Sequence, residues 1–213
     1  MSEPTRFTIL ASKILKRIHT MTNEMKFAET VILVDAAYLD RVTGDLSKHF
    51  SQVVGRTLAS ADLAVALECL CLDGGVPLGQ HAIQVLFIYD EESRKLAAFQ
   101  PSDLVQELNN VGFQSQLGEF SLFTFEPSDM ATREELFLES LKLVADAQEV
   151  KRLLVVPAEE EYGDKVSAIL NKVDGKEQMT VFGMNPPADE MAAKWEMLGF
   201  ALLQALGIKA EEL

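Results

Sequence analysis

The sequence lacks the short motifs by which many enzymes are identified. It has no G-x-G-x-x-G turn after its first apolar run and no G-x-x-x-x-G-K-[ST] loop, so the usual fingerprints of nucleotide-binding folds are missing. A G-x-S-x-G turn is also absent, which removes support for serine hydrolysis. The three histidines share no spacing that would place two of them on one helical face. We therefore expect no cofactor on the basis of these motifs.

Cysteines and long hydrophobic runs are also scarce. Cys69 and Cys71 stand two residues apart in an expected helix, where their side chains diverge by roughly 200°, so we expect neither a disulfide nor a zinc site. No stretch reaches the roughly 18 unbroken apolar residues of a transmembrane helix. Lys13, Lys16 and Arg17 interrupt the N-terminal apolar run, which argues against a secretory signal. The sequence predicts a cytoplasmic protein outside the membrane.

Positive charge is in short supply. The 213 residues include 19 Lys and Arg against 33 Asp and Glu, which gives a formal net charge of -14. A broad basic face for a nucleic-acid backbone would have to form against the field of the protein itself. This composition argues against tight non-specific binding of RNA or DNA, although it leaves a local basic groove open.

What the sequence does contain is a series of continuous apolar runs bounded by turn signals. Their β-branched and aromatic residues do not alternate with polar ones, which is typical of strands buried on both faces of a parallel sheet. We expect strands at 30–35, 83–90, 121–126, 152–157 and 179–184.

Helical patterns lie between the expected strands. We expect two helices within 45–72, split near Ser60, and further helices over 101–113, 128–147, 160–173 and 187–208. The third of these would begin at Ser102 and end at Gly112, and the fourth would be capped by Ser128 or Asp129.

The alternation of strands and helices predicts the fold class. It is typical of an α/β protein, a three-layer α/β/α sandwich with a mainly parallel, Rossmann-like central sheet. Ligands of such folds gather beyond the carboxyl ends of the strands. The acids of this sequence follow those ends, among them Asp35, Asp90, Glu126 and Glu159.

Two of these acidic strand ends resemble the NYN branch of the PIN-like nuclease domains. In that family a first strand ends in Asp, followed by a small or polar residue and a leucine-bearing turn, and "VILVDAAYL" (31–39) is similar to it. A later strand of the family runs into Ser-Gly-Asp-x-Asp-Phe, and "LLVVPAEEEY" (153–162) aligns with it position by position. In this alignment Glu159 and Glu161 stand for the two aspartates, and Tyr162 stands for the phenylalanine.

Further segments extend the resemblance over roughly residues 28–185. "EELFLES" (134–140) offers Glu135 for the acid of the family's Val-Asp-Val-x-Leu run. The strand at 83–90, followed by "LVQELNNVGFQSQL", is similar to the family's strand and to its helix ending in Leu-x-x-x-Gly-Phe.

The resemblance implies two alternative functions. A working member would be a Mg²⁺- or Mn²⁺-dependent ribonuclease, with Asp35, Glu135, Glu159 and Glu161 as catalytic residues and Asp35, Glu159 and Glu161 holding the metal. Here, however, Pro157 and Ala158 replace the family's Ser-Gly, and each later Asp has become the longer Glu. A metal site must hold its ligands within about 0.5 Å. These departures favour a degenerate, non-catalytic PIN/NYN-like binding or assembly module with an unknown protein partner, and RNA is a partner only under the alternative.

Simpler structural roles compete with a site. Asp35 would equally serve to cap the turn that leaves the first strand. The acids 159–161 would favour the positive end of a helix dipole. For Glu160, which should point away from its neighbours, we expect only this structural role.

The two ends of the chain suggest a division into three parts. Residues 1–27 would be an N-terminal helical extension, with Phe7, Leu10, Ile14 and Ile18 at helical spacing; this is either a peripheral or membrane-surface helix or lies upstream of the true start. Residues 28–185 would form the α/β domain. Residues 186–213 would be an amphipathic helix that packs on that domain or forms a dimer interface, so a homodimer is expected.

Overall fold

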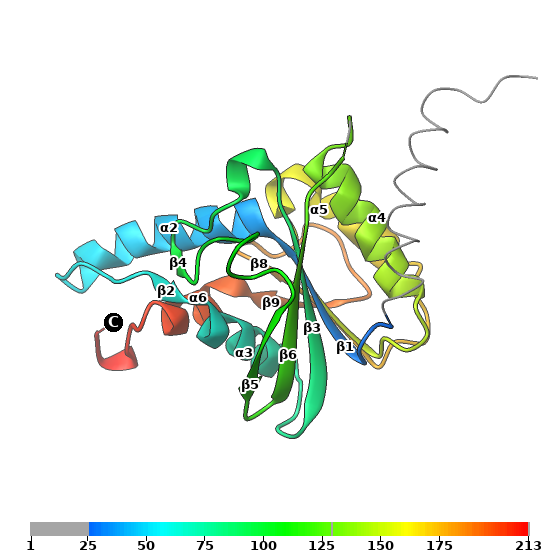
Figure 1. Ribbon diagram of the computed structural model, residues 1–213, viewed down its shortest axis with the longest axis horizontal. Coiled ribbons are helices and arrows are strands. Elements are labelled where there is room, and N and C mark those ends of the chain that lie inside the picture. The colour runs from blue at the N-terminus through cyan, green and yellow to red at the C-terminus, as the bar shows by residue number, and fades with distance from the viewer. Residues whose placement is uncertain (1–25, 129, 213) are drawn as a thin grey trace, which may run out of the picture.

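A computed structural model describes residues 26–128 and 130–212, which form a mixed α/β domain (Figure 1). Seven strands make the main sheet and two short ones make a second sheet. The strands are β1 (Thr30–Asp35), β2 (Ala61–Asp62), β3 (His81–Ile88), β4 (Phe99–Gln100), β5 (Val111–Ser115), β6 (Gly118–Phe125), β7 (Arg152–Val156), β8 (Gln178–Gly183) and β9 (Lys194–Met197). The α-helices of the described part are α2 (Ala36–Val53), α3 (Leu63–Asp73), α4 (Arg133–Asp146), α5 (Glu159–Leu170) and α6 (Leu198–Ala205).

The main sheet is mostly parallel, as the continuous apolar runs predict. Its strand order is β5-β6-β3-β1-β7-β8-β9, and only the pairing of β5 with β6 is antiparallel. Strand β1 occupies the centre and is buried throughout. Because Asp35 at its end is level with Ile88 at the end of β3, acids that follow these two strands emerge at the same edge. All five expected strands are present within three residues of their predicted bounds.

The helices form two groups. Helices α4 and α5 pack against each other, and α3 packs against α6, which also contacts α2. In Figure 1, α4 lies to the right of β3 and β6, whereas α3 and α6 lie to the left. The largest side chains of the core come from both the sheet and the helices, including Phe87, Phe137 and Phe182. No helix in the described ranges is both long and apolar enough to span a membrane.

The helix expected over 101–113 is wrong. This segment forms turns and then strand β5, so Gly112 lies in a strand instead of ending a helix. The Asp103 carboxylate accepts hydrogen bonds from the N–H groups of Val105 and Gln106, which fixes a turn in place of a continuing helix. Local side-chain bonds and pairing with β6 therefore override the apparent helical spacing.

The single helix expected over 187–208 is also wrong. Residues 194–197 form β9, which pairs in parallel with β8, and the helix that follows is only eight residues long. Met191 and Trp195 therefore do not lie on one helical stripe with Leu198. Because β9 is the edge strand of the main sheet, the C-terminal segment completes the sheet and is not an appended helix.

Two smaller expectations concern the beginnings of elements. Helix α4 begins after Thr132, whose side chain accepts a bond from the Glu135 N–H, so the expected cap at Ser128 is wrong. The other candidate, Asp129, lies outside the described residues, as does the helical pattern of residues 7–18. The predicted break near Ser60 is confirmed, since α2 ends at Val53 and α3 begins at Leu63.

Candidate functional site

Arg133, the first residue of α4, gathers three acids at the carboxyl edge of the sheet. Its Nε lies 2.8 Å from Asp35 Oδ2, and its Nη1 lies 2.5 Å from Asp90 Oδ2. Its Nη2 lies 3.2 Å from Glu161 Oε2. Each nitrogen of the guanidinium therefore donates to a different carboxylate, and these acids belong to three separate segments. We call these four residues the Arg133 cluster.

Asp35 is the buried centre of this cluster. Its side chain is fully buried, and its Oδ1 accepts a hydrogen bond of 2.9 Å from the Tyr38 N–H in the first turn of α2. The Tyr162 hydroxyl donates to Oδ2 over 2.5 Å. The capping role expected for Asp35 is therefore present, and the same carboxylate also joins α4 and α5 to the end of β1. Its local and long-range roles coexist.

The surroundings shift the pKa values of Arg133, Tyr162 and Asp90. Burial alone would lower the pKa of Arg133, but the charges of Asp35 and Asp90 outweigh it and raise that pKa above its usual range. Burial and the nearby Asp35 raise the pKa of Tyr162, which therefore stays a hydrogen-bond donor. Burial acts to raise the pKa of Asp90, yet bonds from Ser93 and Arg133 lower it. Arg133 and Tyr162 therefore both act as donors to the carboxylates of this network.

Glu159 faces in another direction, toward the loop after β8. Its carboxylate oxygens accept hydrogen bonds of 3.0 Å from the Met184 N–H and 3.2 Å from the Asn185 N–H. The Asn185 side-chain amide donates a third bond over 3.0 Å. A Cβ on Gly183 would overlap Glu159 Oε2, so the glycine makes this approach possible. Glu159 therefore fastens the start of α5 to the end of β8.

A buried tyrosine hydroxyl lies beside this arrangement. Tyr38 is 2% exposed, and its hydroxyl has no hydrogen-bond partner in the described part of the chain. Burial, followed by the negative charge of Glu159, raises the pKa of Tyr38. The phenol therefore remains protonated next to the carboxylate.

The remaining acids of interest have structural partners. Glu135 accepts a bond of 2.9 Å from the Thr132 N–H while Thr132 accepts one from the Glu135 N–H, which is a capping box at the start of α4. Glu160 forms an exposed ion pair with Arg41 at 2.8 Å. Glu160 lies in the first turn of α5, in agreement with its predicted structural role, and the bonds of Glu135 are those of the capping box.

These positions do not fit a shared divalent cation. Asp35 and Glu161 are both bonded to Arg133, Glu159 is bonded to backbone N–H groups, and Glu135 caps its helix. Mg²⁺ and Mn²⁺ require several convergent oxygen ligands with no competing cation among them. Within residues 26–128 and 130–212, no three His, Cys, Asp or Glu side chains are arranged to hold a metal ion.

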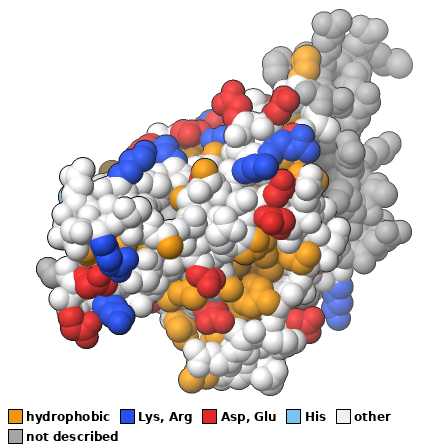
Figure 2. Space-filling view, turned by 60° about the vertical axis from the view of Figure 1, so that its left-hand side comes forward, with side chains coloured by type: hydrophobic (Ala, Val, Ile, Leu, Met, Phe, Trp, Pro, Cys, Tyr) orange, Lys and Arg blue, Asp and Glu red, His pale blue; other side chains and the backbone are white. Residues whose placement is uncertain are grey.

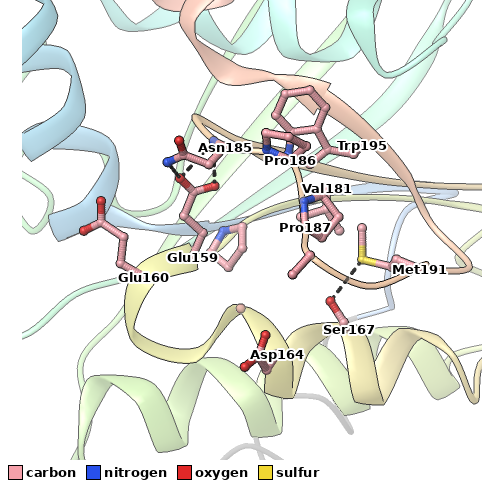
Figure 3. A pocket seen from close by; sticks show the side chains of 13 residues that line it. Glu159, Glu160, Asp164, Ser167, Val181, Asn185, Pro186, Pro187, Met191 and Trp195 are labelled. Atoms are coloured by element: carbon pink, nitrogen blue, oxygen red, sulfur yellow. Dashed lines mark hydrogen bonds between the residues drawn. The ribbon is translucent and has the colours of Figure 1, made fainter.

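A pocket opens on the other side of α5 from the cluster. It has a volume of about 220 Å³ and lies between α5, the loop after β8 and strand β9. Figure 3 shows Asp164 and Ser167 on α5, opposite Pro186 and Trp195. Glu159 is one of the residues that line it, and its carboxylate is bonded to the loop after β8. The pocket is beyond the carboxyl ends of β7 and β8, where ligands of open α/β sheets bind.

Sequence reasoning missed Arg133, the residue on which the cluster depends. One signal was available: Arg133 is the only Lys or Arg between Lys95 and Lys142, in a strongly acidic chain, and it follows the end of an expected strand. Asp90 is visible in the sequence as a strand-end acid, but the resemblance to the nuclease domains gives it no place in the site. An isolated cation among strand-end acids is therefore the pattern that would have located the cluster.

Comparison with known proteins gives a family but no activity. A search of curated proteins and a search of solved structures each found no match to this chain. The sequence model of one family covers residues 24–213, which includes every helix and strand described above. The chain therefore belongs to DUF6621, a family of unknown function.

Proposed function

We propose that this chain is a non-catalytic module of PIN/NYN-like, three-layer α/β/α architecture that serves in binding or assembly. The observation that carries the proposal is the position of Arg133. Its guanidinium lies between the acids of the strand ends, where the resemblance to nuclease domains would require a divalent cation. In this proposal Arg133 holds the acidic side chains together, as a metal ion would, but it does not activate water for hydrolysis.

A guanidinium is well suited to hold several carboxylates together. It is permanently charged, carries five N–H donors in a fixed planar arrangement and cannot be deprotonated in proteins. It therefore stays charged and pairs with Asp35 at every physiological pH. It offers no exchangeable coordination position for a water molecule, so it cannot activate one for attack on a phosphodiester. To bind Mg²⁺, the protein would first have to expel Arg133 from three ionic bonds.

An exposed apolar face supports the assembly part of the proposal. Phe200 on α6 is 67% exposed, and Leu72 on the neighbouring α3 is 43% exposed. Figure 2 turns the left-hand side of Figure 1 forward and shows hydrophobic side chains gathered on this side, with acidic ones among them. Large apolar patches on a soluble domain are commonly protein contacts. A homodimer through this face is our proposal for the oligomeric state.

The metal-dependent ribonuclease stays as the alternative, with Asp35, Glu135, Glu159 and Glu161 as its residues. It would require the side chains described above to rearrange, because Glu135 and Glu159 are bonded elsewhere. No described contact favours that rearrangement.

Thermal unfolding with and without millimolar MnCl₂ tests the proposal directly. A ligand that binds only the native state must raise the melting temperature, so we expect no rise for the wild-type protein. Incubation of single-stranded RNA with Mn²⁺ is the matching activity test, and we expect no cleavage. A rise in melting temperature, or Mn²⁺-dependent cleavage, that disappears in Glu161→Gln would overturn the non-catalytic proposal. Glu161 is 55% exposed, so this variant should fold.

Size-exclusion chromatography with light scattering tests the assembly proposal. We expect a dimer for the wild-type chain and a monomer for Phe200→Asp, because a charge on this exposed ring position would disrupt an apolar contact. A wild-type monomer would contradict the homodimer.

A further inference from the structure

The charged residues that line the pocket beside α5 are all acidic, and none of them belongs to the Arg133 cluster. Three of the residues that line it are acidic, namely Glu159, Glu160 and Asp164, and none of its lining residues is Lys, Arg or His. The chain as a whole carries a net charge of -14, so the surrounding field has the same sign. Both the local and the global electrostatics therefore favour a cation over an anion or a phosphate in this pocket.

Only one of the three acids is available to a ligand. Glu159 already accepts bonds from Met184 and Asn185, and Glu160 is paired with Arg41. Asp164 makes no hydrogen bond or ion pair with any side chain that the structure describes, although it faces the pocket. Its carboxylate is thus the one that can form a new charge-assisted hydrogen bond.

The opposite wall is apolar. Pro187, Met191 and Trp195 line it, and Val181 lies deeper in the pocket. Such a wall gains nothing from a small hydrated ion but packs well against methylene groups, and a thioether and an indole are adaptable partners for an alkyl chain. The pocket therefore offers a carboxylate for a charged end and an apolar surface for the stem that carries it.

The size of the pocket restricts the ligand further. Its volume of about 220 Å³ is below the roughly 300–1,000 Å³ of sites that enclose drug-sized molecules. It suits a single extended side chain or a small aliphatic amine, and it is too small to enclose a nucleotide or a large cofactor.

We propose that this pocket binds an alkyl cation, that is, an ammonium or guanidinium group on an aliphatic stem. Asp164 holds the charged end, and Met191 and Trp195 pack against the stem. Two sources present this chemistry: a Lys or Arg side chain of a partner protein, and a free aliphatic amine. The inference rests on the proposed function in one respect, because it names what the binding module binds.

The single tryptophan of the chain makes the pocket directly observable. In a ¹H–¹⁵N spectrum of the full chain, the one indole resonance belongs to Trp195. Titration with Nα-acetyl-lysine methylamide should shift this resonance in a saturable way. Nα-acetyl-norleucine methylamide has the same stem without the ammonium group and should produce at most a small shift. Equal binding of the two compounds would overturn the proposal, as would no shift with either.

Two matched variants locate the cation. Asp164→Asn removes the free carboxylate with little change in shape, and we expect it to weaken binding of the blocked lysine roughly tenfold. Asp174→Asn makes the same change at an exposed position outside the lining of the pocket, and it should leave the affinity unchanged. Loss of affinity in both variants to the same extent, or in neither, would show that Asp164 does not hold the ligand and would overturn the proposal.

Two further titrations separate the sources. A lysine-containing peptide that binds more tightly than the blocked residue would identify a protein partner. Spermidine or butylamine binding more tightly than the peptide would identify a free amine. Both results depend on Asp164 in the same way. Because neither titration involves Mn²⁺ or RNA, a negative result here leaves the test of the Arg133 cluster untouched, and the reverse also holds.

Discussion

Asp35 and Glu159 lie at the carboxyl ends of neighbouring strands, yet they are stabilised in opposite ways. Asp35 is fully buried and is neutralised by one side chain, Arg133, that lies 98 residues away in the sequence. Glu159 is partly buried and is satisfied mainly by backbone N–H groups of Met184 and Asn185. The first arrangement requires the side chain of Arg133. The second requires that position 183 have no side chain, because a Cβ there would overlap Glu159. Substitutions that separate these two requirements test the comparison.

Removing Arg133 should have the largest effect. Arg133→Met keeps the stem but leaves Asp35 as an unpaired buried charge, which typically costs about 3–5 kcal/mol. We expect a loss of this size in the free energy of unfolding, measured by urea denaturation.

A second substitution shows whether the unpaired charge is the cause. Asp35→Asn in the Arg133→Met background should recover part of the loss, because the amide carries no charge to neutralise. If Arg133→Met is equally costly with Asp35 and with Asn at position 35, the ionic bond is not what Arg133 contributes.

A side chain at Gly183 should have the next largest effect. Gly183→Ala forces Glu159 away from its N–H partners, and overpacking of this kind costs about 1–3 kcal/mol. The matched control is Gly44→Ala in the middle of α2, where a Cβ would meet no atom within 4 Å. That variant should stabilise the protein by up to about 1 kcal/mol. The same sign for both variants in thermal or urea unfolding would contradict this account of Gly183.

The capping box at α4 should contribute less than either of these. Thr132→Ala removes the acceptor for the Glu135 N–H and should cost about 0.5–2 kcal/mol. Asp62→Ala, which removes the cap of α3, should cost a similar amount.

The melting temperature of Glu135→Ala should respond to MnCl₂ as that of the wild-type protein does. If Mn²⁺ raised the melting temperature of the wild-type protein but not that of Glu135→Ala, Glu135 would be a metal ligand.

The Arg41–Glu160 pair should have the smallest effect. Both side chains are about half exposed, and such surface pairs contribute roughly 0–1 kcal/mol. We expect Glu160→Gln to change the free energy of unfolding only slightly and the difference to vanish in high salt. A large cost would mean that Glu160 contributes more than this surface pair.

The parts of the fold that could be predicted are those fixed by local hydrophobicity. The strand at 30–35 is apolar throughout because both of its faces are covered, and that pattern is visible without knowledge of its neighbours. The segments 101–113 and 187–208 were predicted as helices because their apolar residues recur at helical spacing. Within or overlapping these segments, residues 111–115 and 194–197 form strands β5 and β9 instead, because edge strands gain their stability from pairing with β6 and β8, which no local pattern records.

The site was predictable only in outline. The strand-end position of Asp35 follows from its sequence, and so does its possible role as a cap. Its bond to Arg133 does not, because a side chain reaching across 98 residues is determined by the order of strands in the sheet. The sequence therefore locates the acids but not the cation that they share.

The connections of Arg133 also bear on the order of folding. It is bonded to residues 98, 43 and 28 positions away in the chain, so these bonds can form only after β1, β3 and the start of α5 have come together. Contacts with such long sequence separations are costly to form early, because loop closure must come first. The cluster should therefore form on the native side of the folding barrier. Arg133 would then mainly slow unfolding. Its removal should raise the unfolding rate constant much more than it lowers the folding rate constant.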